Sequence, residues 1–536
     1  MLPGASRVVI SPRCVWGRSI CALLLLWLVG WVGGRASAQA QSRPDPRFGA
    51  VEAFWAPDEA ARVQLGWERI LFFWSEIQPT GPEDWNTLHV DDRWLARAQA
   101  DGREVVGVIK QTPAWATDGL PAAGVPRGLY LPPSDPKNLW ANFVRRIAAY
   151  YGPRGVHDWI IWNEPDIPPD VYGHEFSGSV VDYYRLVKVA YQVMRAADPE
   201  AVIHLAGLTY WHDALAGRPQ YLQRFLETAS ADSEAPAHNY FFDVISLHVY
   251  FRVETIPSLI AAMNNIQAEF GLAKPVWLNE TNAAPNLDPE WPTTRQMFSV
   301  DLEQQAWFVA QALALGLASG AERVEVYKFT DVLAQPGTEP FGLLRADLSP
   351  RPALTALATT IELLQGFTDV RSQPTETTHR LTFRLPGRFV RVLWARRAES
   401  VTLRLGAIAP MGEVVDVTGR TRPVAAEGGS YTLTLDSARC EADCLIGGPP
   451  LFLVERLPSS PTPTPTPTLT TPAPTTAPTA TPRPTATAAA VISGQAEGEN
   501  SAESLPPALP PTRLILVIAA LISLAAVGLW RLFKEA

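Results

Sequence analysis

The chain has 536 residues, of which 47% are hydrophobic and only 18% are charged, so it can form a sizeable core and roughly two to four domains. Its formal net charge of -9 argues against a nucleic-acid-binding protein, because such a protein presents a basic face to the phosphates. An ordinary soluble domain does not explain the 49 prolines and 18 tryptophans, so their positions guide the division of the chain.

Residues 1–40 have the pattern of a secretory signal peptide. Arg7, Arg13 and Arg18 precede an apolar run over residues 20–29, and the small residues at 36–40 form two A-x-A cleavage patterns. The alternative is an N-terminal anchor that is not cleaved. Both alternatives predict that the bulk of the chain is exported.

Short apolar runs alternate with amphipathic stretches over residues 45–366. The expected strands are Gly49–Ala53, Arg69–Phe73, Glu104–Ile109, Asp158–Trp162, Val202–Ala206, Val244–His248, Val276–Asn279 and Val324–Tyr327. The expected helices include Leu139–Tyr150, Val180–Ala197, Pro257–Phe270, Leu302–Leu317 and Arg351–Leu364. This alternation predicts parallel strands in a (β/α)₈ barrel. The alternative, an open doubly wound sheet, is disfavoured because no Gly-rich phosphate loop follows the first strand.

The pattern changes over residues 369–456, where apolar and polar residues alternate with a period of two. Four such runs lie at 381–385, 390–394, 401–405 and 431–435, and turn residues separate them. This period is typical of half-buried antiparallel strands. We therefore expect a small C-terminal β-sandwich after the barrel.

The chain has four cysteines, two of which, Cys14 and Cys21, lie in the signal peptide. Cys440 and Cys444 remain in the exported part and are close enough to form a disulfide, which we predict. No cluster of His and Cys accompanies them, and the other histidines show no metal-ligand spacing. The sequence therefore predicts no metal site.

The C-terminal part has the composition of a tether. Residues 458–512 form a Pro/Thr-rich stalk and a polar linker, which cannot bury a core and should be extended. Residues 513–531 are apolar with basic flanks, and they predict a transmembrane helix followed by a short cytoplasmic tail at 532–536. The expected localisation is therefore exported and anchored to the cell membrane, with the barrel outside.

Two glutamates follow expected barrel strands in matching positions. Glu164 ends the fourth strand in Trp162-Asn163-Glu164-Pro165, and Glu280 ends the seventh in Trp277-Leu278-Asn279-Glu280. The carboxyl ends of barrel strands surround the active site, and the fourth and seventh lie on opposite sides of it. Two carboxylates facing each other are what glycoside hydrolysis needs. A salt bridge at the barrel mouth is the alternative for either residue alone.

The segment Trp162-Asn163-Glu164-Pro165 resembles the acid/base motif of the clan A glycoside hydrolases. The resemblance covers roughly residues 45–456 and is closest to family 39 (β-xylosidase-like) or family 5 (cellulase-like). It implies that Glu164 is the general acid/base, that Asn163 contacts the sugar 2-hydroxyl, and that Glu280 is the nucleophile. The implied reaction is retaining and needs neither a metal nor an organic cofactor.

Further positions agree with the clan. Arg69 corresponds to the arginine near the nucleophile, and His248-Val249-Tyr250 resembles the clan's His-x-Tyr, whose tyrosine orients the nucleophile. The eighth strand departs from the pattern, because Tyr327 or Phe329 stands where a tryptophan usually forms the floor of the glycone subsite. This departure leaves the glycone sugar open.

Aromatic residues in the expected strand-to-helix loops are candidates for sugar platforms. Trp115, Trp211 and Trp291 lie in such loops, where an indole can contact the C–H face of a sugar. We include Trp115 and Tyr327 with Arg69, Asn163 and His248 among the predicted substrate-binding residues, and Tyr250 completes that set.

The sequence thus predicts a glycosidase that acts on β-linked oligo- or polysaccharides. A carbohydrate substrate and the membrane are the expected partners, with no nucleic acid and no obligate protein partner evident. Two alternatives remain open at this point: a non-catalytic surface protein that binds carbohydrate on a barrel scaffold, and a transglycosylase that uses the same residues.

Overall fold

The computed structural model describes residues 43–458 apart from 295–297 and 441–443. Within these residues no helix combines the length and the apolar composition that a membrane crossing requires. The predicted signal peptide, the predicted stalk beyond residue 458 and the predicted C-terminal span fall outside the described residues.

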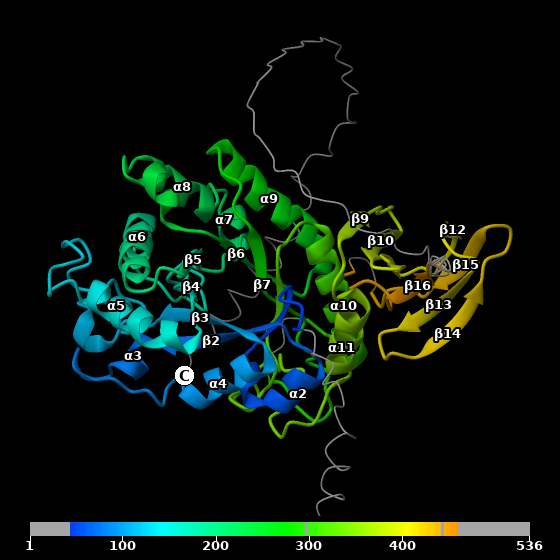
Figure 1. Cartoon of the computed structure of the whole chain (residues 1–536), viewed down its shortest axis with the longest axis horizontal. Helices are drawn as coiled ribbons and strands as arrows, with labels where there is room; N and C mark the ends of the chain where they lie inside the picture. The colour runs from blue at the N-terminus through cyan, green and yellow to red at the C-terminus, as the bar shows by residue number, and fades with distance from the viewer. Residues whose placement is uncertain (1–42, 295–297, 441–443, 459–536) are drawn as a thin grey trace, which may run out of the picture. The chain divides into compact units, whose positions relative to one another are not determined.

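Eight parallel strands form the barrel that the sequence predicts (Figure 1). They are β1 (Phe48–Val51), β2 (Trp67–Phe73), β3 (Glu104–Lys110), β4 (Asp158–Ile161), β5 (Val202–Leu205), β6 (Ile245–Tyr250), β7 (Val276–Asn282) and β8 (Val324–Val326). The helices around them are α2 (Pro57–Arg62), α3 (Trp74–Ile77), α4 (Asp92–Asp101), α5 (Leu139–Tyr151), α6 (Val180–Ala197), α7 (Trp211–Leu215), α8 (Tyr221–Ser230), α9 (Ile256–Glu269), α10 (Leu302–Ala318) and α11 (Pro352–Leu364).

The order of the strands decides between the two predicted architectures. The sheet runs β5-β4-β3-β2-β1-β8-β7-β6, so β1 pairs with both β2 and β8. Between β5 and β6, isolated parallel bridges join His204 to Val244 and Leu208 to Leu247. The sheet is therefore almost closed, as in a (β/α)₈ barrel and unlike an open doubly wound sheet.

Large apolar side chains fill the inside of the barrel. Trp67 on β2 and Trp277 on β7 contact each other edge to face, with 5.2 Å between ring centroids, and they share a buried cluster with Val106 and Ile160. A Cβ on Gly49 of β1 would lie 2.3 Å from the Trp67 indole, so glycine makes room for that ring. The filled interior leaves the ends of the strands as the place for chemistry.

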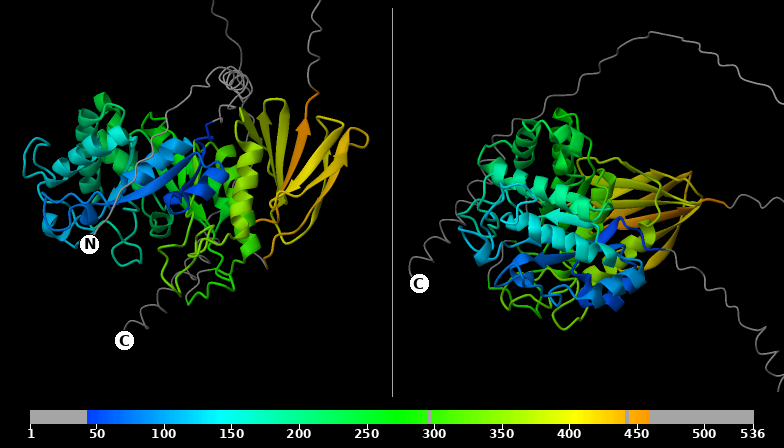
Figure 2. Two further views of the ribbon diagram at one scale, coloured as in Figure 1. Left: turned by 60° about the horizontal axis from the view of Figure 1, so that its bottom comes forward. Right: turned by 60° about the vertical axis from the view of Figure 1, so that its left-hand side comes forward.

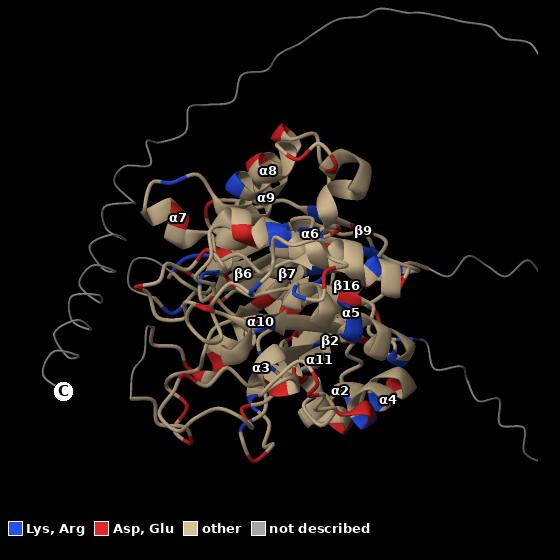
Figure 3. Cartoon of the chain, turned by 90° about the vertical axis from the view of Figure 1, so that its left-hand side faces the viewer, with Lys and Arg blue, Asp and Glu red and all other residues tan. Residues whose placement is uncertain are grey.

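Helix starts are set by local hydrogen bonds. Ser179 is the N-cap residue of α6 and Asp301 is the N-cap residue of α10. Each forms a capping box with the residue three positions later. Such boxes satisfy backbone N–H groups that would otherwise lack partners. Helices such as α4 and α8 contain both acidic and basic residues (Figure 3).

Antiparallel strands follow α11 and form the predicted sandwich. They are β9 (Asp369–Ser372), β10 (Thr378–Leu385), β11 (Arg388–Ala395), β12 (Val401–Gly406), β13 (Met411–Asp416), β14 (Thr421–Ala425), β15 (Ser430–Leu435) and β16 (Leu451–Arg456). One sheet has the order β14-β13-β16-β11-β10-β9, and the other contains β12 and β15. Cys440 and Cys444 are joined by a disulfide.

The larger sheet packs one face against α10 and α11 (Figure 2). Side chains of alternate residues, including Phe383, Val392 and Trp394, join the same buried cluster as the apolar face of these helices. Gln311 of α10 is fully buried there. Its amide donates to the Gly448 carbonyl at 2.8 Å and accepts from the Gly447 N–H at 3.0 Å.

We predict that Gln311→Ala lowers the free energy of unfolding by about 2–4 kcal/mol, because it leaves two buried backbone groups without partners. Urea unfolding followed by tryptophan fluorescence measures this change. Gln223→Ala on α8, whose amide bonds to an exposed Glu227, is the matched control and should change stability by less than about 0.5 kcal/mol. Equal effects of the two substitutions would contradict this role of Gln311.

Candidate active site

The candidate active site lies at the carboxyl ends of the barrel strands, where the backbone takes unusual conformations. Trp162 and Glu164, directly after β4, have φ angles of 73° and 41°, and Glu52 after β1 has a φ of 59°. Non-glycine residues seldom occupy this left-handed region, and those that do cluster at functional sites. The main chain of Glu164 is held by a bond from its N–H to the Gly207 carbonyl at 3.1 Å.

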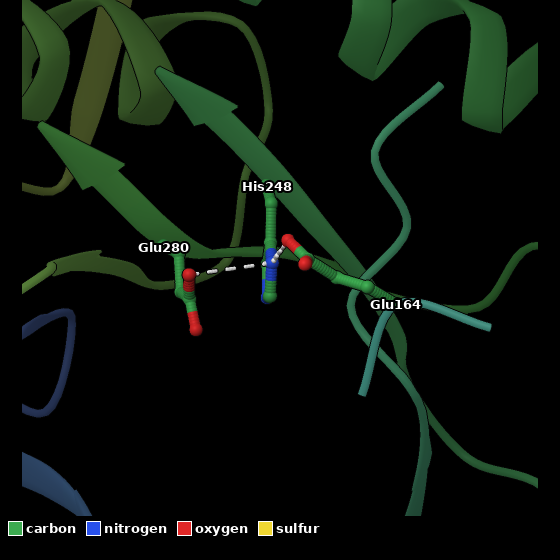
Figure 4. A group of neighbouring side chains, drawn as sticks. All are labelled: Glu164, His248 and Glu280. Carbon is green, nitrogen blue, oxygen red and sulfur yellow. Dashed lines mark hydrogen bonds and ion pairs between the residues drawn. The ribbon is translucent and has the colours of Figure 1, made fainter. Parts of the chain in front are cut away.

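The structure brings Glu164, His248 and Glu280 together at this mouth (Figure 4). Nδ1 of His248 lies 2.7 Å from Oε1 of Glu164 and 3.4 Å from Oε2 of Glu280. The imidazole therefore stands between the two carboxylates, which come from opposite sides of the barrel. One ligand-type atom from each residue lies within 4.8 Å of the other two.

Such a group of atoms could in principle hold a metal ion. In the structure, Nδ1 of His248 contacts the Glu164 carboxylate and lies near that of Glu280. The arrangement fits two carboxylates prepared for proton transfer and nucleophilic attack.

A single glycine makes the position of His248 possible. A Cβ added to Gly207, which follows β5, would lie 1.8 Å from Nε2 of His248. The imidazole thus packs against bare backbone. The sequence analysis did not single out Gly207, because nothing in a lone glycine after a strand indicates which side chain approaches it.

Arg69 and Tyr250 hold the carboxylate of Glu280. The Arg69 guanidinium donates to Oε1 of Glu280, and the Tyr250 hydroxyl donates to Oε2. Burial opposes ionisation of Glu280, but the charges of Arg69 and His248 and these hydrogen bonds outweigh it, so the pKa of Glu280 lies below its ordinary value. Glu280 is therefore ionised, as a nucleophile must be.

A second acid, Glu325 on β8, lies behind this pair. Its Oε2 is 3.4 Å from Nε of Arg69, and its side chain is fully buried. Burial raises the pKa of Glu325 well above its ordinary value, although the Arg69 charge acts in the opposite direction. The raised pKa disfavours ionisation of Glu325, so this acid competes less with Glu280 for the charge of Arg69.

Asn163 and a second ion pair lie beside Glu164. Nζ of Lys110, at the end of β3, is 2.6 Å from Oε1 of Glu175 in the loop after β4. The pKa of Glu175 is raised, mainly by burial and also by the charge of Glu164. Lys110 and a hydrogen bond from Asn163 act in the opposite direction without cancelling this effect. Asn163 is thus near both the acid/base candidate and a neighbouring carboxyl group.

Tyr327 and Lys328 lie after β8, next to the nucleophile. The Tyr327 ring contacts the Tyr250 ring edge to face, with 5.9 Å between centroids, and it is partly exposed. Phe329 is fully buried, so Tyr327 is the one of the two predicted replacements that can reach a ligand. Nζ of Lys328 lies 3.9 Å from Oε2 of Glu52.

The predicted platform tryptophans have structural contacts of their own. The Trp115 indole N–H donates to the Gln78 carbonyl at 2.7 Å, and its ring packs edge to face on Trp74. The Trp291 indole N–H donates to the Thr338 carbonyl at 3.0 Å. Both remain partly exposed at the catalytic face, so their outer surfaces can still meet a ligand.

Five ionisable residues at the mouth were missed by sequence reasoning. They are Glu52, Lys110, Glu175, Glu325 and Lys328. A lone acid within the apolar run Val324-Glu325-Val326 is a signal that could have identified Glu325, because a buried charge without a partner is costly. Glu175 lies in a long loop, and no pattern in the sequence predicts its pairing with Lys110.

Comparison with known proteins supports the predicted resemblance at the level of the fold. No family model matches the chain, and no curated protein matches it. A family 39 glycoside hydrolase from Bacteroides cellulosilyticus is similar in structure, with a TM-score of 0.58, 17% identity, and coverage of 77% of this chain and 81% of that one.

Two further solved structures share this fold. A family 30 endoxylanase from Clostridium papyrosolvens has a TM-score of 0.51 and 11% identity, covering 77% of this chain and 97% of its own. A glucosidase from Croceicoccus marinus has a TM-score of 0.50 and 14% identity, covering 75% and 92%. The chain thus shares its fold with these three solved structures.

We predict that the stability of Glu325→Gln, measured relative to wild type at the same pH, is greater at neutral pH than near pH 4. The pKa of Glu325 is raised on folding, so its ionisation opposes folding increasingly as the pH rises above the value in the unfolded chain. Glutamine cannot ionise and avoids this cost. Urea unfolding from about pH 4 to 7 should show the difference, variant minus wild type, becoming more positive.

The matched control is Glu362→Gln, at an exposed position of α11, where the difference should not vary in this way. A loss of stability in Glu325→Gln that grows with pH would show that the ionised form of Glu325 supports Arg69.

Proposed function

We propose that the chain is a retaining glycosidase that cleaves β-linked oligo- or polysaccharides through a glycosyl-enzyme intermediate. The observation that carries this proposal is the placement of Glu164 and Glu280 across the barrel mouth, with one carboxylate oxygen of each within 4.8 Å of the other. Such a close approach supports retention, because retaining enzymes hold their two carboxyl groups closer together, about 5–5.5 Å, than inverting enzymes, which need about 6.5–9.5 Å to admit a water molecule.

The two glutamates divide the reaction between them. Ionised Glu280 attacks the anomeric carbon while Glu164 donates its proton to the departing glycosidic oxygen. A water molecule then gives a proton to Glu164 and attacks the same carbon, which releases Glu280. Two displacements at one carbon retain its configuration.

The surrounding residues support each step. Arg69 and Tyr250 orient Glu280 and keep it ionised before attack. His248 contacts both carboxylates, and Asn163, which precedes Glu164 in the chain, would contact the sugar 2-hydroxyl, as the resemblance to the clan motif implies. Family 39 is among the similar folds, which agrees with the resemblance of Trp162-Asn163-Glu164-Pro165 to the clan motif.

The location of the enzyme is part of the same proposal. The signal-peptide pattern at 1–40 and the apolar run at 513–531 support export and anchoring outside the membrane on the Pro/Thr-rich stalk. A barrel held in this way would act on glycans outside the cell.

Glu280→Ala should lower kcat on aryl β-glycosides by at least about 10³-fold, because no nucleophile remains. Added azide should restore turnover and give a glycosyl azide of inverted configuration, since only one displacement occurs. Glu164→Ala should instead give a retained glycosyl azide. The anomeric configuration of the glycosyl azide, determined by NMR, separates the two roles.

Several outcomes would contradict the assignment. A wild type without turnover on a wide glycoside panel would favour a non-catalytic binding protein. Products dominated by transfer to added sugar acceptors would favour a transglycosylase. Full activity of Glu280→Ala would exclude Glu280 as the nucleophile.

Tyr250→Phe should move the acidic limb of the kcat/KM–pH profile to higher pH. The Tyr250 hydroxyl lowers the pKa of Glu280, so its removal raises that pKa and the nucleophile is protonated at a higher pH. Loss of a hydrogen bond to a charged group should also reduce kcat/KM by about 10- to 100-fold.

Tyr184→Phe is the control, because it removes a hydroxyl near the start of α6 that is bonded to Asp232, after α8, and should leave the profile unchanged. An unshifted acidic limb in Tyr250→Phe would show that this hydroxyl does not set the ionisation of Glu280.

A further inference from the structure

Glu52 and Lys328 form a pair of charged side chains at the barrel mouth that the proposed reaction does not use. Glu52 follows β1 and Lys328 follows β8, and these two strands pair directly with each other. The segment after β8 stays beside β1, because the Phe329 N–H donates to the Val51 carbonyl at 2.9 Å. The two charged side chains therefore come from neighbouring positions on the rim of the mouth.

The pair lies close to the nucleophile candidate. The Tyr327 ring, directly before Lys328 in the chain, contacts the Tyr250 ring. The hydroxyl of Tyr250 in turn donates to Glu280. Burial raises the pKa of Glu52, the charge of Lys328 lowers it, and the charge of Glu280 raises it further. The carboxyl group of Glu52 is thus within electrostatic reach of the nucleophile.

The pair also lies across the mouth from the acid/base candidate. The strand order of the barrel places β8 and β1 opposite β4 and β5, and Glu164 follows β4. In a retaining glycosidase the acid/base faces the leaving group, while the nucleophile becomes bonded to the glycone. Glu52 and Lys328 are therefore placed to contact the glycone rather than the leaving group.

The protein leaves both charged groups with unused hydrogen-bonding capacity. Nζ of Lys328 lies 3.9 Å from Oε2 of Glu52, beyond hydrogen-bonding distance, and the side chains are only 11% and 12% exposed. Within the described part of the chain, this ion pair is the one polar side-chain contact that either group makes. Charged groups that are buried to this extent are normally hydrogen-bonded. A ligand at the mouth can supply the bonds that the protein does not.

The spacing of the two charged atoms fits one hydroxyl group between them. A hydroxyl oxygen about 2.8 Å from each atom would bridge the 3.9 Å gap without moving either side chain. Such a hydroxyl accepts a hydrogen bond from the ammonium group and donates one to the carboxylate. A sugar hydroxyl combines both functions on one atom, whereas a carbonyl or ether oxygen can only accept.

We propose that Lys328 and Glu52 together bind one hydroxyl group of the glycone, at a ring position away from the anomeric carbon. This inference rests on the proposed glycosidase function and assigns two specificity-determining residues to the same site. The resemblance to the clan motif gives the 2-hydroxyl to Asn163, so the hydroxyl bound by the pair is at C3, C4 or C6. Because hydrogen bonds to charged groups are strong, a sugar without this hydroxyl would be a poor substrate.

The charges around the pair indicate a neutral glycone. The ammonium group of Lys328 is balanced by the carboxylate of Glu52, and the charge of Glu280 acts on the same place. A uronic acid would bring a third carboxylate into this group, and like charges at short distance repel each other. We therefore expect aryl β-glycosides of neutral sugars to be better substrates than the corresponding glucuronide.

The test combines variants of the pair with deoxy substrates. The parent substrate is the aryl β-glycoside that the wild type hydrolyses with the highest kcat/KM, and each of its 3-, 4- and 6-deoxy analogues lacks one hydroxyl. We expect Lys328→Met and Glu52→Met each to lower kcat/KM on the parent by about 10- to 100-fold. On one analogue, the same for both variants, each substitution should cost less than about threefold, because the hydroxyl partner is already missing.

Lys274→Met and Glu362→Met are the matched controls. Lys274 is half-buried and precedes β7 at the opposite end of the barrel, and Glu362 is exposed on α11. Both should change kcat/KM by less than about twofold on every substrate. Urea unfolding of each variant establishes that it is folded, and Lys328→Gln and Glu52→Gln replace a methionine variant that is not.

The outcomes separate this inference from the proposed function. Equal losses on the parent and on all analogues would mean that the pair is only structural, and would overturn the inference while the observed turnover supports the proposed function. A glucuronide that is hydrolysed faster than every neutral glycoside would do the same. If the wild type hydrolyses no glycoside, the proposed function fails. The same comparison is then made on the Kd of the parent and its analogues by calorimetry, where absent binding or equal losses overturn the inference too.

Discussion

The candidate site depends on one buried cation, the guanidinium of Arg69, which lies between two acids inside the barrel. An isolated buried charge is prohibitively costly, so Arg69 must be paired, and the two available partners are Glu280 and Glu325. The surroundings resolve the competition in favour of Glu280. Glu325 is fully buried and has a raised pKa, while Glu280 also accepts a hydrogen bond from the Tyr250 hydroxyl and lies near the charge of His248, which lower its pKa. One arginine thereby lowers the pKa of Glu280, while burial keeps the pKa of Glu325 raised.

The barrel makes this arrangement possible because its parallel strands all end at one mouth. Residues that are far apart in the chain meet there, as the 116 positions between Glu164 and Glu280 illustrate. Local backbone features refine the geometry. Glu164 adopts a left-handed conformation after β4, and Gly207 after β5 gives His248 room to approach both carboxylates. These features place side chains at hydrogen-bonding distance without widening the barrel.

The sandwich uses its two faces for different purposes. The outer face of its larger sheet packs on α10 and α11, where Gln311 satisfies two buried backbone groups. The inner face packs on β12 and β15 over part of its width. The accessory domain predicted from the sequence thus has an apolar interface on each face of its larger sheet.

The sequence by itself determined the architecture and the two central acids. Strand and helix periods alternate strongly enough to predict all eight barrel strands within a few residues, and Glu164 and Glu280 stand in recognisable positions after apolar runs. The larger sheet of the sandwich was predicted only in part, because β9 and β14 are short and exposed, and β13 and β16 lack a strict alternation of buried and exposed residues. Only the tertiary structure decided which charges share a partner and how Gly207 admits His248. These features depend on distances between elements far apart in the chain, and a local pattern of residues contains no information about such distances.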